Sequence, residues 1–271
     1  MLKRILTGLC LICVVAGFFF LRSLNTAYFE ILIMLFMIVG TFEMTRAFKN
    51  KLSIYQVTII TIFSLVIVPM YHLFLLNGII SSFFCLGLLI LSGLVFDRKS
   101  NVENSAYSLF IAFYPSMMLS TLLFVNDLLL NSTLALTIIF IISPVADTMA
   151  FAVGCTFKGK KLCPAISPKK TISGAIGGLA GGVLASIILY YLFKNNIVFN
   201  GFMPEVLVFV LIGLIGAMFT EFGDLMESGI KRNLGIKDMG KILPGHGGIM
   251  DRIDGVIFAS CFVFACFVLL I

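Results

Sequence analysis

Nine apolar runs follow one another along the chain, with short polar segments between them. A helix needs about 20 residues to cross about 30 Å of hydrocarbon, and each run comes close to that length. The runs are residues 5–21, 27–45, 53–71, 77–96, 106–125, 128–150, 172–193, 205–228 and 253–271. The last run is just long enough to span. The pattern therefore predicts an all-α protein with about nine transmembrane helices.

The positive charges are distributed unevenly between the two sides that these spans define. If the N-terminus lies inside, the inner segments contain 17 of the 19 Lys and Arg residues, and only Arg22 and Lys194 fall outside. Lys and Arg accumulate in short cytoplasmic segments of membrane proteins. A count of eight or ten spans would place Lys- and Arg-rich segments on both sides of the membrane. We therefore expect nine helices, with the N-terminus inside and the C-terminus outside.

The composition excludes a water-soluble globule. The chain has 271 residues, of which 60% are hydrophobic and 12% charged, whereas soluble domains carry about 25% charged residues. The first apolar run is longer than the roughly 7–15 residues of a signal peptide's apolar region and ends without a small-residue cleavage site. We expect it to remain as the first helix of a multi-pass membrane protein.

No internal repeat, long linker or soluble insertion divides the chain. We therefore expect one membrane domain over residues 1–271, with N-terminal helices in 1–130 and catalytic helices and cytoplasmic loops in 131–271. Gly174, Gly178 and Gly182 recur at four-residue spacing in the run 172–193. Small residues at this period allow helices to pack closely in lipid, which favours a packing role for them.

The segment 221–255 concentrates charge in a chain that is otherwise almost uncharged. Ionisable side chains at a membrane are expensive to bury, so they usually mark a functional site. Glu221, Asp224 and Ser228 fall on one helical face. This face could end in a salt-bridged cap near Lys231 and Arg232. Metal binding is the favoured interpretation for Asp224. For Glu221, a salt bridge at the end of the helix is favoured.

The loop 229–250 alternates glycine with positive charge, an arrangement suited to phosphate because glycine lets backbone N–H groups approach it. Contact with an anionic lipid surface is the alternative, but aspartates interrupt the basic run. Asp251 and Asp254 follow as i, i+3 neighbours that could share a cation. His246 lies among glycines and is more readily a phosphate donor or a structural residue than a base.

A second constellation lies upstream. Ser143–Pro144 is expected to break a helix, and Asp147 follows in apolar surroundings. A loop from Gly159 then leads to Ser167-Pro-Lys-Lys-Thr171, directly before a helix expected to start at Ile172. Hydroxyls, lysines and free helix N–H groups together suit an anion.

These residues resemble the phosphatidate cytidylyltransferases, also called CDP-diacylglycerol synthases. The family's C-terminal motif runs Ser-x-x-Lys-Arg, four residues, Lys-Asp-x-Gly, then Pro-Gly-His-Gly-Gly-x-x-Asp-Arg-x-Asp. The residues that meet it are Ser228, Lys231, Arg232, Lys237, Asp238, Gly240, Pro244 to Gly248, Asp251, Arg252 and Asp254. The stretch Ile166–Thr171 matches a second family motif. The sequence departs from the family at Ser173, where a Glu is usual, and at Cys155, where a basic residue is usual.

The resemblance implies Mg²⁺-dependent cytidylyl transfer from CTP to phosphatidate, which gives CDP-diacylglycerol and pyrophosphate. The residues expected to act in the reaction are Asp224, Asp251, Lys231 and Arg252. Those expected to bind the substrates are Arg232, Lys237, Lys241, His246, Gly247, Gly248, Ser167, Lys169, Lys170 and Thr171. Those expected at the metal are Asp224, Asp251, Asp254, Asp238 and Asp147.

Two other functions share some of these sequence features. A CTP-dependent polyprenol or dolichol kinase would need the same metal, nucleotide and lipid. A transporter usually shows repeated halves and interrupted helices near the middle of the bilayer, whereas here the charge is confined to one end and no repeat is visible.

The expected partners are CTP, Mg²⁺ (alone or with a second cation) and phosphatidate in the bilayer. No nucleic acid is expected, and a homodimer is left open. The expected location is a bacterial cytoplasmic membrane, with the active site facing the cytoplasm.

Overall fold

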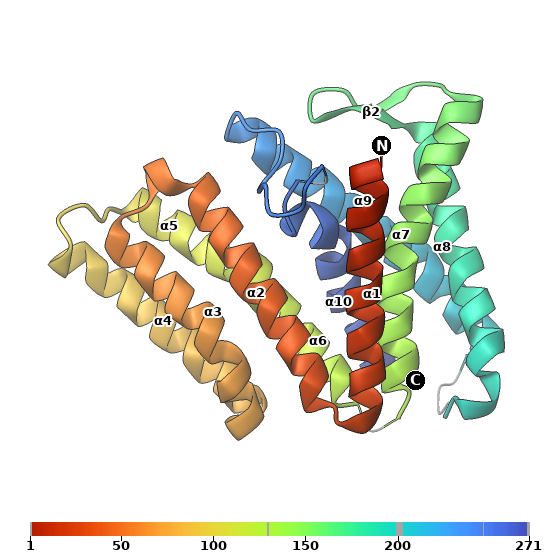
Figure 1. Cartoon of the computed structure of the whole chain (residues 1–271), viewed down its shortest axis with the longest axis horizontal. Helices are drawn as coiled ribbons and strands as arrows, with labels where there is room; N and C mark the ends of the chain where they lie inside the picture. The colour runs from red at the N-terminus through yellow and green to blue at the C-terminus, as the bar shows by residue number, and fades with distance from the viewer. Residues whose placement is uncertain (1, 129, 199–202, 246, 270–271) are drawn as a thin grey trace. The chain divides into compact units, whose positions relative to one another are not determined.

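The computed structural model describes residues 2–128, 130–198, 203–245 and 247–269. Its elements are mostly helices (Figure 1). They are α1 (Leu2–Leu24), α2 (Ala27–Ala47), η1 (Lys49–Lys51), α3 (Ile54–Phe74), α4 (Leu76–Phe96), α5 (Val102–Ile111), η2 (Ala112–Met117), α6 (Thr121–Asn126), α7 (Ser132–Phe157), β1 (Lys161–Cys163), β2 (Ser167–Thr171), α8 (Ile172–Phe193), η3 (Lys194–Asn196), α9 (Glu205–Asn233) and α10 (Met250–Leu269).

The helical prediction is confirmed. Eight helical stretches of the described chain are long and apolar enough to cross a membrane. A ninth long helix, α10, has 20 residues and carries charge in its first turn. The chain is therefore an all-α, multi-pass membrane protein. Which end of each helix faces the cytoplasm stays a prediction.

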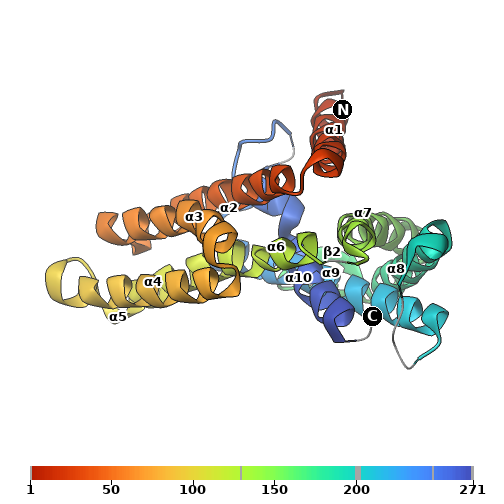
Figure 2. The ribbon, with the colours of Figure 1, turned by 90° about the horizontal axis from the view of Figure 1, so that it is seen from below.

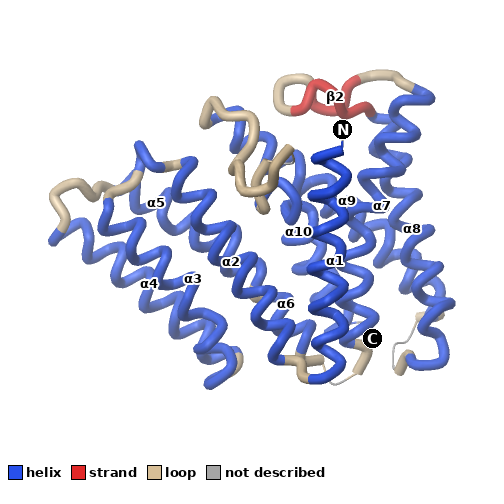
Figure 3. The backbone as a smooth tube through the Cα atoms, viewed as in Figure 1, coloured by secondary structure: helices blue, strands red, loops and turns tan. Residues whose placement is uncertain are grey.

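Two details of the secondary structure differ from expectation. Pro144 lies inside α7, which continues to Phe157, so the predicted helix break there is wrong. Proline is tolerated because neighbouring residues can satisfy the freed backbone groups of a membrane helix. The segment expected to be a loop before Ile172 instead forms an antiparallel hairpin, in which Lys161 pairs with Thr171 and Cys163 with Ser167 (Figure 3).

By their internal contacts, the residues form two compact units, both discontinuous in sequence. The N-terminal unit comprises Met1–Leu123 and Ile236–Asp251, and the C-terminal unit comprises Phe124–Gly235 and Arg252–Ile271. The expected division near residue 130 falls close to the first of these boundaries. Residues 236–251, expected among the catalytic segments, pack with the N-terminal helices.

In the N-terminal unit, α3 packs against α2 and α4. The starts of α3 and α5 are joined by polar contacts. Ser53 and Asn101 each begin a helix with a capping box, and the Gln56 side chain donates a 2.7 Å hydrogen bond from Nε2 to Oδ1 of Asn104. Capping satisfies N–H groups that the first turn of a helix leaves without partners.

In the C-terminal unit, α8 packs against both α7 and α9 (Figure 2). Glycines of α8 make the close approach possible. A Cβ added at Gly182 would lie 2.5 Å from Cβ of Ala217 and 2.6 Å from the carbonyl oxygen of Gly213, both on α9. The predicted packing role of the glycine series is confirmed at this position.

Candidate active site

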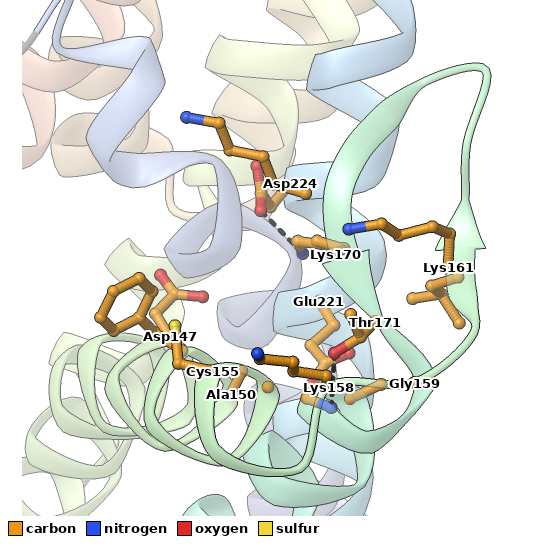
Figure 4. A pocket seen from close by; sticks show the side chains of 16 residues that line it. Asp147, Ala150, Cys155, Lys158, Gly159, Lys161, Lys170, Thr171, Glu221 and Asp224 are labelled. Atoms are coloured by element: carbon orange, nitrogen blue, oxygen red, sulfur yellow. Dashed lines mark hydrogen bonds and ion pairs between the residues drawn. The ribbon is translucent and has the colours of Figure 1, made fainter.

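A cavity of about 620 Å³ lies in the C-terminal unit, where the end of α7, the hairpin, the start of α8 and the middle of α9 meet (Figure 4). Its walls combine carboxylates, lysines and small residues. The lining residues are Asp147, Ala150, Phe151, Gly154, Cys155, Lys158, Gly159, Lys161, Leu162, Lys169, Lys170, Thr171, Gly174, Ala175, Glu221 and Asp224.

Three carboxylates occupy the part of the wall that α7 and α9 form. Asp147 comes from α7, and Glu221 and Asp224 come from α9, three residues apart on one face. Glu221 is only 7% exposed, and its Oε1 has no hydrogen-bond partner among the described residues. Gly178 of α8 leaves room for this carboxylate, because a Cβ at that position would collide with Oε1. A buried oxygen without a donor is costly, so this wall favours a cation.

Lysines form a further part of the wall. Lys158 follows α7, Lys161 lies in β1, and Lys169 and Lys170 lie in β2. The Lys170 ammonium lies 2.7 Å from Oδ2 of Asp224, with 22% and 34% of the two side chains exposed. The hairpin thus brings a cation to the acidic face of α9. A cavity that holds both charges can accept a polyanion together with its metal.

The N-terminus of α8 opens beside these lysines. Thr171 caps the helix, since its Oγ1 accepts a 3.1 Å hydrogen bond from the backbone N–H of Gly174. Ser173, which departs from the family pattern, donates its hydroxyl to the carbonyl oxygen of Lys158, so it joins the end of α7 to the start of α8. Helix N-termini favour anions, which is consistent with the predicted anion site.

The side chains of the cavity can supply only some of the ligands that a metal ion needs. Among the described residues, no group of three or more Asp, Glu, His and Cys side chains lies close enough to hold an ion by itself. Mg²⁺ usually keeps several waters and is bound through one or two carboxylates plus substrate phosphates. Asp224 and the buried Glu221 oxygen supply ligands of this kind. The cavity therefore fits a hydrated divalent cation.

The end of α9 holds two residues predicted to act on the substrates. Lys231 is 8% exposed, and its ammonium lies 3.2 Å from Oε1 of the fully buried Glu227. Arg232 donates from Nε to the carbonyl oxygen of Ile166, a 3.3 Å bond to the turn of the hairpin. The Lys231 contact lies within α9, whereas the Arg232 contact ties α9 to the hairpin. The predicted contacts of both residues with phosphate stay predictions.

Two predicted residues lie in the first turns of α10. Oδ1 of Asp254 accepts a hydrogen bond from the backbone N–H of Gly255, and its carboxylate is within electrostatic range of Asp147 and Asp224. Arg252 lies within electrostatic range of Asp147. These positions extend the mixed charge of the cavity to a further helix.

The remaining predicted residues belong to the N-terminal unit. Lys237, Asp238 and Lys241 are exposed on the glycine-rich loop (residues 236–249). Oδ2 of Asp251 accepts backbone hydrogen bonds from Met239 at 2.9 Å and from Gly248 at 2.8 Å, so this oxygen holds the loop. His246 lies outside the described residues.

Five predicted residues therefore line one cavity; they are Asp147, Lys169, Lys170, Thr171 and Asp224. Ser167 lies in β2 but does not line it. Asp251 belongs to a different unit from Asp224, and their convergence on one cation stays a prediction.

Lys158 and Lys161 also line the cavity. They are not among the predicted site residues, although both belong to the inner positive charges. Both lysines lie in sequence between Asp147 and the Ser-Pro-Lys-Lys-Thr segment, and this position could have indicated that they belong to the site.

The chain is similar in sequence to known proteins. The model of the cytidylyltransferase family matches residues 2–270. Phosphatidate cytidylyltransferases of Staphylococcus haemolyticus and Staphylococcus aureus are 40% and 43% identical over 119 residues, 44% of this chain and 43% of each relative. That of Mycobacterium bovis is 42% identical over 112 residues, 41% of this chain and 34% of the relative.

The chain thus aligns with less than half the length of these relatives. The match to the family model, in contrast, runs through nearly every residue and includes both units. The chain belongs to the cytidylyltransferase family.

Proposed function

We propose that this protein transfers the cytidylyl group of CTP to phosphatidate, giving CDP-diacylglycerol and pyrophosphate. The observation that carries the proposal is the cavity in which Asp147, Glu221 and Asp224 face four lysines. The family match and the names of the similar proteins support the same reaction.

The chemistry suits such a wall. An oxygen of the phosphatidate phosphomonoester attacks the α-phosphorus of CTP and forms the new P–O bond. The bond from the α-phosphorus to the bridging oxygen breaks, and its electron pair leaves with pyrophosphate. A phosphomonoester has a second pKa of about 6 and is largely ionised at neutral pH, so the nucleophile needs no strong base. The barrier lies in bringing two polyanions together and stabilising the leaving group.

Basic and acidic residues have different roles in the reaction. Four lysines bind phosphate oxygens and offset the repulsion between the phosphates; they are Lys158, Lys161, Lys169 and Lys170. Asp224 and Glu221, with Asp147 in support, would hold Mg²⁺ at the same wall. When bound, the ion screens the phosphates and polarises the reacting centre. Asp251 is proposed as a second ligand, and the glycine-rich loop as a backbone cradle for the triphosphate.

The substrates also fix where the site must lie. Phosphatidate is held in the bilayer, whereas CTP is a water-soluble nucleotide made in the cytoplasm. We therefore place the cavity at the cytoplasmic face of the bacterial inner membrane, in agreement with the charge asymmetry of the segments between helices.

A labelling experiment tests the proposal. Purified protein is incubated with phosphatidate, Mg²⁺ and CTP that is labelled either in the base or in the γ-phosphate. Base label in the lipid fraction, with γ-label released as pyrophosphate, is expected. Transfer of γ-label to a lipid would instead show a kinase and would overturn the proposal.

A further inference from the structure

Glu43 is a buried acid near the end of α2, a helix long and apolar enough to span the membrane. It is 1% exposed. A carboxylate in such a position requires partners, because neither lipid nor an apolar helix face can solvate it. Its partners are found more than two hundred residues later in the chain.

Both oxygens of Glu43 accept hydrogen bonds from the backbone where the glycine-rich loop meets α10. Oε1 accepts from the N–H of Ile249 at 3.1 Å, and Oε2 accepts from the N–H of Met250 at 2.9 Å. These N–H groups lie at the start of α10, where a helix leaves its first donors without internal partners. Glu43 supplies acceptors from another helix.

The loop also closes around the Glu43 carboxylate. A Cβ at Gly240 or at Gly248 would overlap its side-chain atoms, so glycine is required at both positions for the loop to come this close. Asp251 holds the same loop through the N–H groups of Met239 and Gly248. Two carboxylates together accept four backbone N–H groups, which fixes both ends of the loop.

We propose that Glu43 is a positioning residue, which holds the glycine-rich loop in the conformation that receives the nucleotide's phosphates. This inference rests on the proposed function, because it gives the loop the CTP triphosphate as its ligand. It assigns the N-terminal helices a part in the reaction beyond membrane anchoring, since α2 provides the support for the loop.

Three substitutions separate the contributions of size, charge and hydrogen bonding. Glu43→Leu removes both acceptors. Glu43→Gln keeps the size and one acceptor but turns an amide N–H₂ toward the second backbone donor. Glu43→Asp keeps both oxygens on a shorter stem. The matched control is Glu30→Leu, which removes another buried acid of α2, at 8% exposure, whose partner is His72 at 3.2 Å.

The first readout is backbone hydrogen exchange, which is independent of activity. Glu43→Leu should speed exchange in peptides that cover residues 239–250 and leave the hairpin 161–171 unchanged. Glu30→Leu should change neither. Unchanged exchange at 239–250 in Glu43→Leu would overturn the inference, whatever the activity of the protein. Faster exchange throughout the chain would also overturn it, because it would indicate general destabilisation.

The second readout is the kinetic pattern for CTP. The loss of a group that orients a ligand-binding residue typically lowers activity about 10- to 100-fold. We expect Glu43→Leu to raise the KM for CTP by about this factor, with Glu43→Asp and Glu43→Gln intermediate and the KM for phosphatidate unchanged. A fall in kcat with an unchanged KM for CTP would contradict the positioning role. Absence of cytidylyl transfer by the unaltered protein would instead refute the proposed function, and the exchange result would still stand.

Discussion

Two glycines one helical turn apart in α8 should respond differently to the same substitution, one by a loss of stability and the other by a loss of activity. Gly178 and Gly182 are both buried on the face of α8 that contacts its neighbours. At Gly182 a new Cβ would meet Ala217 and the backbone of Gly213. At Gly178 it would meet the end of the Glu221 side chain, which can rotate away.

The magnitudes follow from these contacts. Alanine in place of glycine favours a helix interior by about 0.8–1.0 kcal/mol. At Gly182 the added Cβ lies 2.5 Å from Cβ of Ala217 and 2.6 Å from the Gly213 oxygen, and overpacking of this kind costs about 1–3 kcal/mol. Contacts this short belong at the upper end of that range, so we expect Gly182→Ala to lose about 1–2 kcal/mol of unfolding free energy.

At Gly178 the other close atoms lie at 3.3 Å, namely the Ala146 oxygen and Cβ of Ala150. Small adjustments relieve such contacts, so the stability of Gly178→Ala should stay near that of the unaltered protein. The Glu221 carboxylate, however, must leave its place at the cavity wall. Activity should therefore fall in this variant without a loss of folded protein.

Thermal unfolding in detergent and turnover of CTP measure the two effects. For a chain of this size, 1 kcal/mol corresponds to about 2–4 °C in Tm. Gly182→Ala should unfold several degrees lower, and Gly178→Ala should keep its Tm but lose kcat. An unchanged Tm in Gly182→Ala would refute the close packing of α8 on α9. Full activity in Gly178→Ala would remove Glu221 from the site.

Three further predictions concern other parts of the molecule. Lys231→Met takes the lysine partner from the buried Glu227, so thermal unfolding should show a loss of about 3–5 kcal/mol, and the double variant with Glu227→Gln should recover most of it. Hydrogen bonds, that from Ser53 foremost, lower the pKa of the Asp97 carboxyl below its usual 3.8. The ionised carboxylate therefore stabilises the fold above pH 3.8, and this stabilisation is lost as the pH falls through the lowered pKa. Asp97→Asn should reduce the decline of Tm at acidic pH. Chelation of divalent cations should abolish cytidylyl transfer, and added Mg²⁺ should restore it; transfer that persists in the chelator would refute the metal requirement.

The helices could be predicted from the sequence because each must present apolar residues to lipid over a fixed thickness. Pro144 was misinterpreted for a physical reason. In water a proline interrupts a helix, but the long α7 keeps its course through it. The hairpin was missed because β1 and β2 are short, of 3 and 5 residues, and rich in lysine.

Part of the site was predictable because its residues differ so strongly from their surroundings. Asp224 was predicted from charge in apolar sequence and Lys170 from the Ser-Pro-Lys-Lys-Thr stretch, and the two form an ion pair. Glu43 was not predicted, because a single acid in an apolar run gives no indication of its partner. The N–H groups that it binds lie 206 and 207 residues away. Backbone donors leave no trace in the side-chain pattern, so only the fold reveals this contact.

The most direct test of the proposed reaction is the amount of pyrophosphate released per CTP consumed when phosphatidate is added to the purified protein. We expect equal amounts of pyrophosphate and lipid-bound cytidylyl, and none in Asp224→Asn, which removes the carboxylate charge beside Lys170. Release of CDP or inorganic phosphate in place of pyrophosphate would contradict cytidylyl transfer, and an Asp224→Asn variant as active as the unaltered protein would contradict the site.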